Sequence, residues 1–269
     1  MTSFSALILT HNSERRLQQC LESLSWVDDL VIVDDESIDQ TRAIAAEFGA
    51  RIFTRDFDTF SGQRNFALAQ CTGTWVIAID SDETLTPELA AQLREAVQRW
   101  PDTGGFRMPR RNHLLGRWVR GCGWYPDIAV RCYRRDGAIY SGDVHEGLHF
   151  PGTVISLSGP VLHFPYESLE QYVAKLNRYS TMSAREAYAA GKHCPLIRLI
   201  MRPPINFLKH YLMQGGIFDG IPGLLVSALS AYYTLLKWSK LYYMEKAQAC
   251  GTVTDEDAQE CREQSPSTM

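Results

Sequence analysis

Four short, nearly continuous apolar runs alternate with helical patterns in the first hundred residues, and this alternation constrains the fold more than any other feature. The runs are ALIL (6–9), LVIV (30–33), ARIF (50–53) and WVIAI (75–79). Continuous β-branched runs of this length are typical of strands that are buried on both faces of a parallel sheet. We therefore expect an α/β chain whose first 100 residues form a Rossmann-like half.

Helical patterns fill the gaps between these runs. Leucines recur at helical spacing after Ser13, a candidate N-cap, and a second helical pattern follows Asp39. A third helix is expected over residues 62–71, and a fourth begins at the Thr86-Pro87 step, since proline is favoured in the first turn of a helix. The order is β-α-β-α throughout.

The pattern changes after Pro101, where shorter alternating runs such as IAVRCY (128–133) and VISLS (154–158) predict antiparallel strands and long loops. From about Ser168 the chain is helical again, and its last residues are polar and acidic. We expect a domain over residues 1–167, with halves 1–100 and 101–167, a helical extension over residues 168–250, and a disordered tail over residues 251–269.

The helical extension contains an uncharged stretch of 17 residues, from Gly220 to Leu236. It is shorter than the ~20 residues that span a bilayer. The lysines around it, with Trp238 and Tyr242, resemble an interfacial belt, which favours an amphipathic helix lying on a membrane. A helix that packs in a protein core is the alternative.

Charge is distributed unevenly, although the whole chain carries only −4. Residues 1–100 hold 8 basic against 16 acidic side chains, whereas residues 101–250 hold 18 against 10. The middle region is therefore a candidate surface for anionic partners, and nucleic acid is disfavoured because no base-reading motif accompanies the charge. Seven scattered cysteines without a Cys-x-x-Cys pair, and the lack of an N-terminal signal pattern, favour reduced thiols in a cytoplasm.

The strongest chemical motif is IAIDSDE (77–83), which places Asp80 and Asp82 at the end of a buried strand. Ligands bind at this edge in open α/β sheets. Two carboxylates two residues apart along an extended segment point to the same side, so they can act on one divalent ion, Mg²⁺ or Mn²⁺, and on sugar hydroxyls around it. The alternative is that both acids only cap the helix that begins near Pro87.

Polar residues also end the first two strands. VIVDDESIDQT (31–41) places Asp34 and Asp35 at the second strand end, with Asp39 a candidate cap for the next helix, and Thr10-His11-Asn12 ends the first strand. A carboxylate here can accept from a base N–H or a ribose hydroxyl. We expect the three strand ends to form one binding site.

These motifs, LTHN (9–12), VDDESID (33–39), QRNFAL (63–68) and DSDE (80–83), resemble the inverting family 2 glycosyltransferases of the GT-A fold, over residues 4–165. The resemblance implies a mixed central sheet flanked by helices, a nucleotide-sugar donor and a divalent metal. It implies that Asp35 reads the uracil of a UDP-sugar and that Arg64 lies near the base or diphosphate. It further implies a nucleotide pocket lined by Thr10, Asn12 and Glu14, a metal on Asp82, and Asp80 at the ribose or the metal's water shell.

The segments GCGWYPDIAVRCYRR (121–135), GDVHEGL (142–148), VLHFPY (161–166) and FDGIPGL (218–224) resemble the bacterial lipopolysaccharide core β-glucosyltransferase branch. That likeness implies a catalytic base in the loop from Asp143 to Glu146. Inverting transfer needs one carboxylate to deprotonate the acceptor hydroxyl. We assign Glu146, with Asp143 in reserve and His145 orienting the base. Salt bridges to nearby arginines are the alternative for both acids.

Three further residues complete the predicted site. His163 ends an apolar run and is a candidate third metal ligand, although a packed histidine is the commoner case. Trp124 offers an aromatic face to an acceptor sugar, or is core, and Asp127 is assigned with His145 to the same acceptor site. The arginines between residues 107 and 135 can grip phosphate groups or form a solvated face.

Together these features predict an inverting transferase that moves glucose from UDP-glucose to an inner-core heptose of lipopolysaccharide. It would act peripherally on the cytoplasmic face of a bacterial inner membrane, on a lipid-anchored oligosaccharide. Transfer to another lipid-linked or capsular glycan shares every donor motif. A non-catalytic nucleotide-sugar-binding membrane scaffold is the alternative from a different class, and it would not need a base at Glu146.

Overall fold

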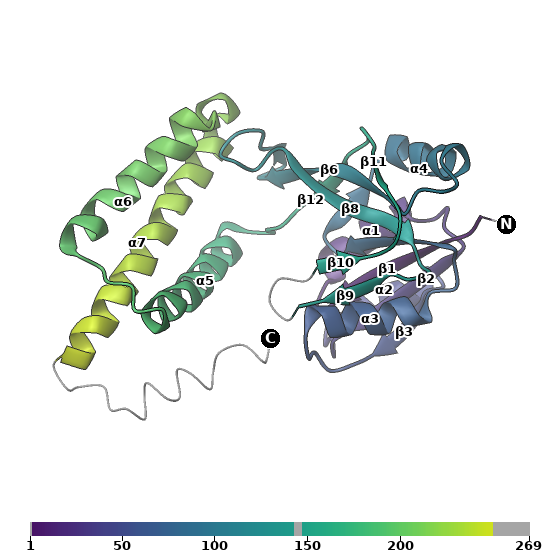
Figure 1. Cartoon of the computed structure of the whole chain (residues 1–269), viewed down its shortest axis with the longest axis horizontal. Helices are drawn as coiled ribbons and strands as arrows, with labels where there is room; N and C mark the ends of the chain where they lie inside the picture. The colour runs from purple at the N-terminus through teal and green to yellow at the C-terminus, as the bar shows by residue number, and fades with distance from the viewer. Residues whose placement is uncertain (1, 143–146, 250–269) are drawn as a thin grey trace. The chain divides into compact units, whose positions relative to one another are not determined.

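The computed structural model describes residues 2–142 and 147–249, and it divides them into two compact units (Figure 1). The first unit contains residues 2–111, 127–142 and 147–163, and the second contains residues 112–126 and 164–249. Residues 112–126, which the sequence pattern suggested for the first domain, group with the helical second unit. The expected acidic tail, 251–269, lies outside the described residues.

The first unit is built on a parallel sheet with the order β3-β2-β1-β4, as the alternation of apolar runs predicts. Its strands are β1 (Phe4–Thr10), β2 (Asp29–Asp34), β3 (Arg51–Thr54) and β4 (Trp75–Asp80). The connecting helices are α1 (Glu14–Ser23), α2 (Thr41–Glu47) and α3 (Phe60–Gln70). This is the Rossmann-like half.

Both faces of the sheet are covered, which is why its strands are apolar at nearly every position. Ala6 and Ile8 pack with Leu17 and Leu21 of α1 on one face, where α4 also contributes. Leu7 packs on the opposite face with the side chains of α3. Figure 1 shows α3 and α4 on opposite sides of the strands.

Antiparallel strands extend the sheet beyond β4, so the sheet is mixed, as expected. The order continues β8 (Asp127–Arg134), β6 (Gly105–Leu114), β12 (Val161–His163), β5 (Glu83–Leu85). β9 (Ile139–Ser141) pairs antiparallel with β10 (Gly147–His149). β11 (Val154–Ser156) pairs with β6 in parallel, so the antiparallel direction predicted for VISLS is wrong. α4 (Pro87–Arg99) begins where the Thr86-Pro87 step predicts, because the Thr86 hydroxyl accepts from the Leu89 N–H.

The second unit is helical apart from β7 (Arg117–Trp118), which pairs with the end of β6. Its helices are α5 (Leu169–Ala189), α6 (Leu196–Leu208), the π-helical η1 (Lys209–Met213), the 3₁₀-helical η2 (Gly216–Asp219) and α7 (Ile221–Ala249). α7 packs against both α5 and α6, with Val226 and Leu241 fully buried. Within the described residues, no helix has the length and hydropathy that crossing a membrane requires.

The packing of α7 shows that residues 220–236 contribute to a protein core. This stretch is the beginning of α7, and Leu225, Val226 and Leu229 pack in a core cluster of the second unit. Leu224, Tyr232 and Leu235 of the same stretch are 40–44% exposed. The core-packing alternative is therefore confirmed for part of the stretch, and its contact with a membrane stays a prediction.

Candidate functional site

The carboxyl ends of β1, β2 and β4 meet at one edge of the sheet, as the sequence predicted. The Thr10 hydroxyl donates to Asp34 Oδ1 at 2.8 Å, and Asp34 also accepts from the Ser37 N–H at 3.0 Å. From the β4 side, the Ser81 hydroxyl donates to the Ser13 hydroxyl at 2.9 Å. Thr10 is only 4% exposed, so it holds the strand ends from inside and does not face solvent.

Asp35 and Asn12 lie at the surface of this edge. Asp35 Oδ1 accepts from the Phe57 N–H at 3.0 Å, and its Oδ2 lies 3.4 Å from His11 Nδ1. Asn12 Oδ1 accepts from the Ile38 N–H at 3.0 Å, and Asn12 itself has a left-handed backbone, φ 47°. The Asp35 carboxylate is 31% exposed, so it can accept a further donor, such as a base N–H.

Glu14 was predicted to line the nucleotide pocket, and the structure shows that it also connects two helices. Its Oε2 accepts from the Gln40 N–H at 3.0 Å, while Asp39 Oδ2 accepts from the Glu14 N–H at 3.1 Å. Asp39 Oδ1 also accepts from the Thr41 N–H at the start of α2, although the N-cap position itself is held by Gln40 and not by Asp39 as predicted. The two carboxylates satisfy N–H groups at the start of each other's helix, which ties α1 to α2.

The end of β4 forms a tight turn into β5, and the turn separates the two predicted metal acids. Asp80 is the last residue of β4, whereas Asp82 lies in the turn. The Asp80 N–H donates to Glu83 Oε2 at 3.1 Å, which closes the turn across its base. Glu83 is fully buried. Asp80 and Asp82 therefore do not share one extended segment.

Three arginines from α3, β8 and β6 converge on the base of this turn. Arg64 Nη2 donates to Asp80 Oδ1 at 2.8 Å, and Arg131 Nη2 donates to Asp80 Oδ2 at 3.1 Å and to Glu83 Oε1 at 2.5 Å. Arg110 donates from Nη1 to Glu83 Oε1 at 3.1 Å and from Nε to Asp127 Oδ2 at 2.7 Å. We call these six side chains the arginine–carboxylate network. Its members are Arg64, Asp80, Glu83, Arg110, Asp127 and Arg131.

Charge inside the network shifts the pKa values of its members. Burial alone would raise the pKa of Asp80, but the charges of Arg131 and Arg64 outweigh it and hold that pKa well below its ordinary value. Burial raises the pKa of Glu83, and the neighbouring Asp80 charge adds to the rise against the pull of Arg131. Burial would lower the pKa of Arg131, but the charges of Asp80 and Glu83 raise it. Asp80 is thus a permanent anion held by permanent cations.

Asp80 and Asp82 have different partners in this structure, and their joint action on one cation stays a prediction. Both Asp80 oxygens accept from guanidinium groups, because α3 and β8 bring Arg64 and Arg131 to the strand end. Asp127, predicted to contact the acceptor, likewise accepts from Arg110. The sequence could not show these partners, since they come from elements 16 to 51 residues away.

Asp82 has different surroundings and fits a divalent ion. Its Oδ2 lies 3.4 Å from His163 Nε2 on β12, and 37% of the Asp82 side chain is exposed. Ligands about 2.1 Å from one octahedral ion lie about 3 Å from their neighbours, so this separation suits two adjacent ligands. Carboxylate and imidazole are both ligands of Mn²⁺. Within the described residues, no group of three or more His, Cys, Asp or Glu is arranged to hold a metal ion.

Two further predictions concern the catalytic loop and the acceptor aromatic. Asp143, His145 and Glu146 lie outside the described residues. Trp124 belongs to the second unit, where its ring centroid lies 6.4 Å from those of both Tyr166 and Tyr172, and its carbonyl accepts from Asn112 Nδ2. This places Trp124 in an aromatic core cluster with partial exposure.

Sequence reasoning missed Glu83 altogether and named Arg110 and Arg131 only as candidates to bind phosphate, not as partners of Glu83 and Asp80. One signal was available for Arg131, since it interrupts the apolar alternation of IAVRCY on what becomes a strand in the middle of the sheet. A charged side chain in such a strand requires a buried partner. Glu83, which directly follows the Asp-x-Asp motif, is the buried acid that pairs with Arg131.

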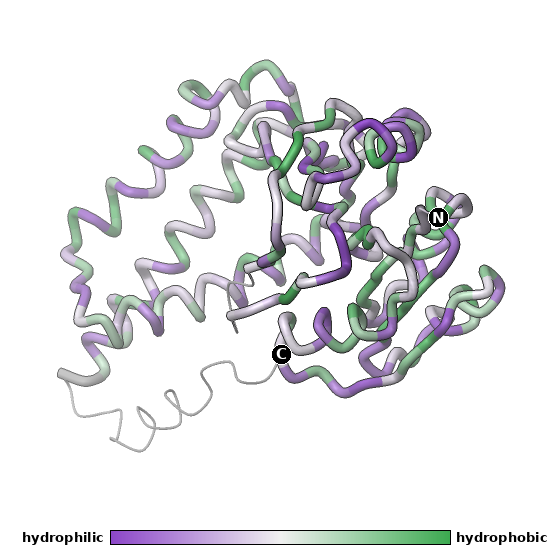
Figure 2. Tube along the Cα trace, turned by 45° about the vertical axis from the view of Figure 1, so that its right-hand side comes forward, coloured by the Kyte–Doolittle hydropathy of each residue, from purple (hydrophilic) through white to green (hydrophobic). Residues whose placement is uncertain are grey.

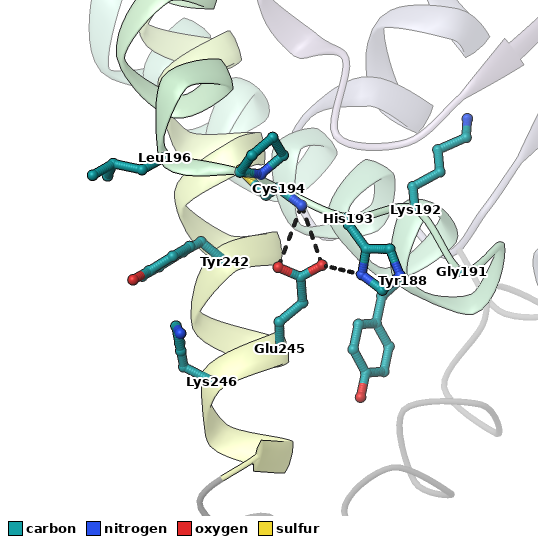
Figure 3. Close-up of a pocket in the computed structure, with 10 residues that line it drawn as sticks. Tyr188, Gly191, Lys192, His193, Cys194, Leu196, Tyr242, Glu245 and Lys246 are labelled. Carbon is teal, nitrogen blue, oxygen red and sulfur yellow. Dashed lines mark hydrogen bonds and ion pairs between the residues drawn. The ribbon is translucent and has the colours of Figure 1, made fainter.

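A hollow of about 720 Å³ lies elsewhere, in the helical unit, and Figure 3 shows the residues that line it. Glu245 of α7 accepts from His193 Nδ1 at 3.0 Å and from the Cys194 N–H at 3.1 Å. These bonds fasten the turn that precedes α6 to α7 (Figure 3). The task of Glu245 is therefore structural.

Comparison with known proteins gives a family match over half of the chain. The model of "Glycosyl transferase family 2" matches residues 5–141. The lipopolysaccharide core biosynthesis glycosyltransferase LpsC of Rhizobium meliloti is 33% identical over 264 residues, which cover 93% of this chain and 96% of LpsC. An uncharacterized glycosyltransferase of Rickettsia typhi is 26% identical over 254 residues, which cover 90% of this chain and 87% of the relative.

Solved structures give more distant matches. Residues 1–349 of S. aureus TarS, crystallised in complex with UDP-GlcNAc, superpose with a TM-score of 0.46 at 16% identity, covering 93% of this chain and 92% of the TarS chain. Glucosyl-3-phosphoglycerate synthase from Mycobacterium tuberculosis, in complex with Mn²⁺, UDP and glucosyl-3-phosphoglycerate, gives a TM-score of 0.44 at 16% identity, covering 64% and 75% of the two chains.

Proposed function

The chain belongs to glycosyl transferase family 2, and on that premise we propose that it is an inverting transferase that moves glucose from UDP-glucose to an inner-core heptose of lipopolysaccharide. The observation that carries the proposal is the nearly end-to-end likeness to a lipopolysaccharide core glycosyltransferase. The likeness covers the second unit as well as the donor half, which supports an acceptor in the lipopolysaccharide core.

The donor fits the edge where β1, β2 and β4 end. The exposed Asp35 carboxylate would accept an N–H from the uracil, and Asn12 lies on the same rim. Arg64, with Arg131 behind it, would face the diphosphate side of the donor, because both guanidinium groups already surround the end of β4. Asp80 would act through these arginines by fixing their positions, rather than as a direct ligand of the nucleotide.

Asp82 and His163 would hold a divalent ion, Mg²⁺ or Mn²⁺, beside the same strand end. Such an ion, when bound, neutralises charge on the departing diphosphate. The arginine–carboxylate network supports that function indirectly, because the bond from the Asp80 N–H to Glu83 fixes the turn that carries Asp82. The chain's own contribution is thus a preformed turn with one exposed acid.

The acceptor step needs a base on the side of the sugar opposite the diphosphate. Glu146 would take the proton from the acceptor hydroxyl as the oxygen attacks the anomeric carbon, and the anomer inverts. Asp143 is the reserve for this role, and His145 would orient the base. Trp124 and Asp127 are proposed contacts of the acceptor, although the core packing of Trp124 and the ion pair of Asp127 with Arg110 limit what each can reach.

The acceptor proposed here is anchored to lipid, so the enzyme would work as a peripheral protein on the cytoplasmic face of the inner membrane. The positive balance of residues 101–250, 18 basic against 10 acidic side chains, supports contact with anionic lipid or phosphorylated oligosaccharide.

The test is UDP release from UDP-glucose in the presence of a heptose-containing core acceptor. Wild-type protein should release UDP and form glucosylated product, whereas Glu146→Gln should lower the rate by about 10²–10⁴-fold, because the amide cannot accept the proton. Glu95→Gln, an exposed site on α4, is the matched control and should keep the wild-type rate. Equal rates for Glu146→Gln and wild type would rule out the base, and turnover with another acceptor alone would rule out heptose.

A further inference from the structure

One side of α6 exposes apolar side chains along its whole length. Ile197, Ile200, Met201, Ile205, Leu208 and Leu212 are each between 46% and 66% exposed. Apart from the adjacent pair Ile200 and Met201, they recur every three or four residues, which places them on one stripe of the helix and its η1 continuation. We call these six residues the α6 face. Figure 2 shows hydrophobic residues recurring along α6 between hydrophilic ones.

The opposite side of α6 is already used. Leu199 packs in the cluster around Leu241, and Asn206 Nδ2 donates to the Ser230 carbonyl of α7 at 3.0 Å. The α6 face is therefore not a core stripe whose partner is α7, because α7 lies against the other side. The apolar exposure continues beyond α6, since Met213 is 83% and Phe218 is 89% exposed. An apolar surface of this extent indicates a partner.

Charge around the α6 face identifies that partner. From residue 187 to residue 218 the chain has no acidic residue, but it has Lys192, Arg198, Arg202 and Lys209. The guanidinium carbons of Arg198 and Arg202 lie 5.1 Å and 6.0 Å from the Trp238 ring centroid, so both charges are held on the flank of the helix beside α7. An apolar stripe with basic residues along one flank, in a long segment free of acids, matches the surface of an anionic bilayer.

We infer that the α6 face inserts into the headgroup region of a membrane rich in anionic phospholipid, with Met213 and Phe218 extending the contact and Arg198, Arg202 and Lys209 on one flank meeting phosphate groups. The inference deepens the proposed function, on which its biological meaning rests, and it adds the α6 face to the 220–236 stretch as a membrane-contacting element. A second copy of the chain is a poorer occupant, because two such faces would bring like charges together.

The experiment is sedimentation of the full chain with vesicles of phosphatidylcholine, with and without about 30 mol% phosphatidylglycerol. Wild type should bind the anionic vesicles, and binding should weaken as salt rises. The double substitution Ile200→Glu with Ile205→Glu should lower vesicle binding by at least about tenfold, because two charges would have to enter the apolar part of the interface. Both sites are exposed, so the circular dichroism spectrum should not change.

The matched control is Ile139→Glu with Val154→Glu, two exposed apolar residues of the first unit that receive the same added charge. It should keep most of the vesicle binding, whereas an equal loss in both variants would show that net charge alone matters and would overturn the inference. Wild-type protein that ignores anionic vesicles, or that forms dimers which the α6 variant dissociates, would overturn it too. Vesicle binding by a protein without transferase activity would refute the proposed function and leave this inference standing.

Discussion

Glu83 has no solvent exposure, yet its carboxylate accepts from two guanidinium groups and from the Asp80 N–H. A buried carboxylate between two arginines cannot be removed without leaving both cations partly unpaired. At the residue scale, this side chain therefore controls both the stability of the first unit and the shape of the turn that carries Asp82.

We predict that Glu83→Ala lowers the free energy of unfolding by about 3–5 kcal/mol, the usual cost of removing one partner from a buried ion pair. Urea denaturation followed by circular dichroism measures this loss. The control is Glu95→Ala on the exposed face of α4, which should change stability by less than about 0.5 kcal/mol. A Glu83→Ala protein as stable as the control would mean that the network adds nothing to folding.

The same residues show how far sequence reasoning reached into the site. The ends of β1, β2 and β4 were predicted to converge, and Thr10, Asp34 and Ser81 show that they do. The division of labour between Asp80 and Asp82 was not predictable, because it depends on arginines that β8 and α3 deliver from distant parts of the chain. Local spacing reveals which acids share a strand end but not which cations reach them.

At the scale of whole elements, α7 is the centre of the second unit. It packs on α5 and on α6, and Leu241 lies fully buried among Ala184, Ala187 and Cys194. We predict that Leu241→Ala lowers the free energy of unfolding by about 2–5 kcal/mol through lost burial and the cavity left behind. Leu235→Ala, at a position that is 41% exposed on the same helix, should cost much less.

Thermal unfolding of both α7 variants, followed by helical circular dichroism, distinguishes the two roles of this helix. A core role requires Leu241→Ala to have the lower midpoint. If α7 instead served mainly to contact lipid, the exposed Leu235 would matter for vesicle binding and Leu241 would tolerate substitution, contrary to its burial.

The FDGIPGL segment (218–224) was identified in the sequence only by its resemblance to a family branch, and the structure shows what two of its residues do. The Asp219 carboxylate accepts from the N–H groups of Arg120 and Gly121, which anchors the loop after β7. A Cβ at Gly223 would collide with the carbonyl oxygen of Gly216, so the start of α7 can approach η2 only at a glycine. The motif therefore connects the loop after β7, η2 and the start of α7 within the second unit.

Elements of the first hundred residues were predictable because each has a strong local signal. Thr86-Pro87 marks the start of α4, and the LVIV run marks β2. The strands β5, β11 and β12 have only three residues each, and their pairing is set by partners far along the chain. No periodicity can be read from so few residues. The sequence therefore predicted that further strands follow Pro101, but not their order in the sheet.

At the scale of the whole molecule, binding of donor and metal should appear as added stability, because a ligand that binds only the folded chain shifts the folding equilibrium. UDP with Mn²⁺ at about one hundred times its dissociation constant adds about 2.7 kcal/mol. For a chain of this size that corresponds to a rise in the melting temperature of about 5–10 °C. UDP alone should give a smaller rise, through Asp35 and the arginines.

Asp82→Asn should remove the part of this rise that depends on Mn²⁺ and keep the part that UDP produces alone, because the amide is a far weaker ligand for a hard cation. Asp102→Asn, an exposed acid in the turn before β6, should respond like wild type. Differential scanning fluorimetry with UDP, with Mn²⁺ and with both measures each part. If Mn²⁺ raises the melting temperature of Asp82→Asn as much as that of wild type, the ion binds elsewhere. The substitution changes one candidate ligand only, in a turn whose shape is fixed by the bond from the Asp80 N–H to Glu83.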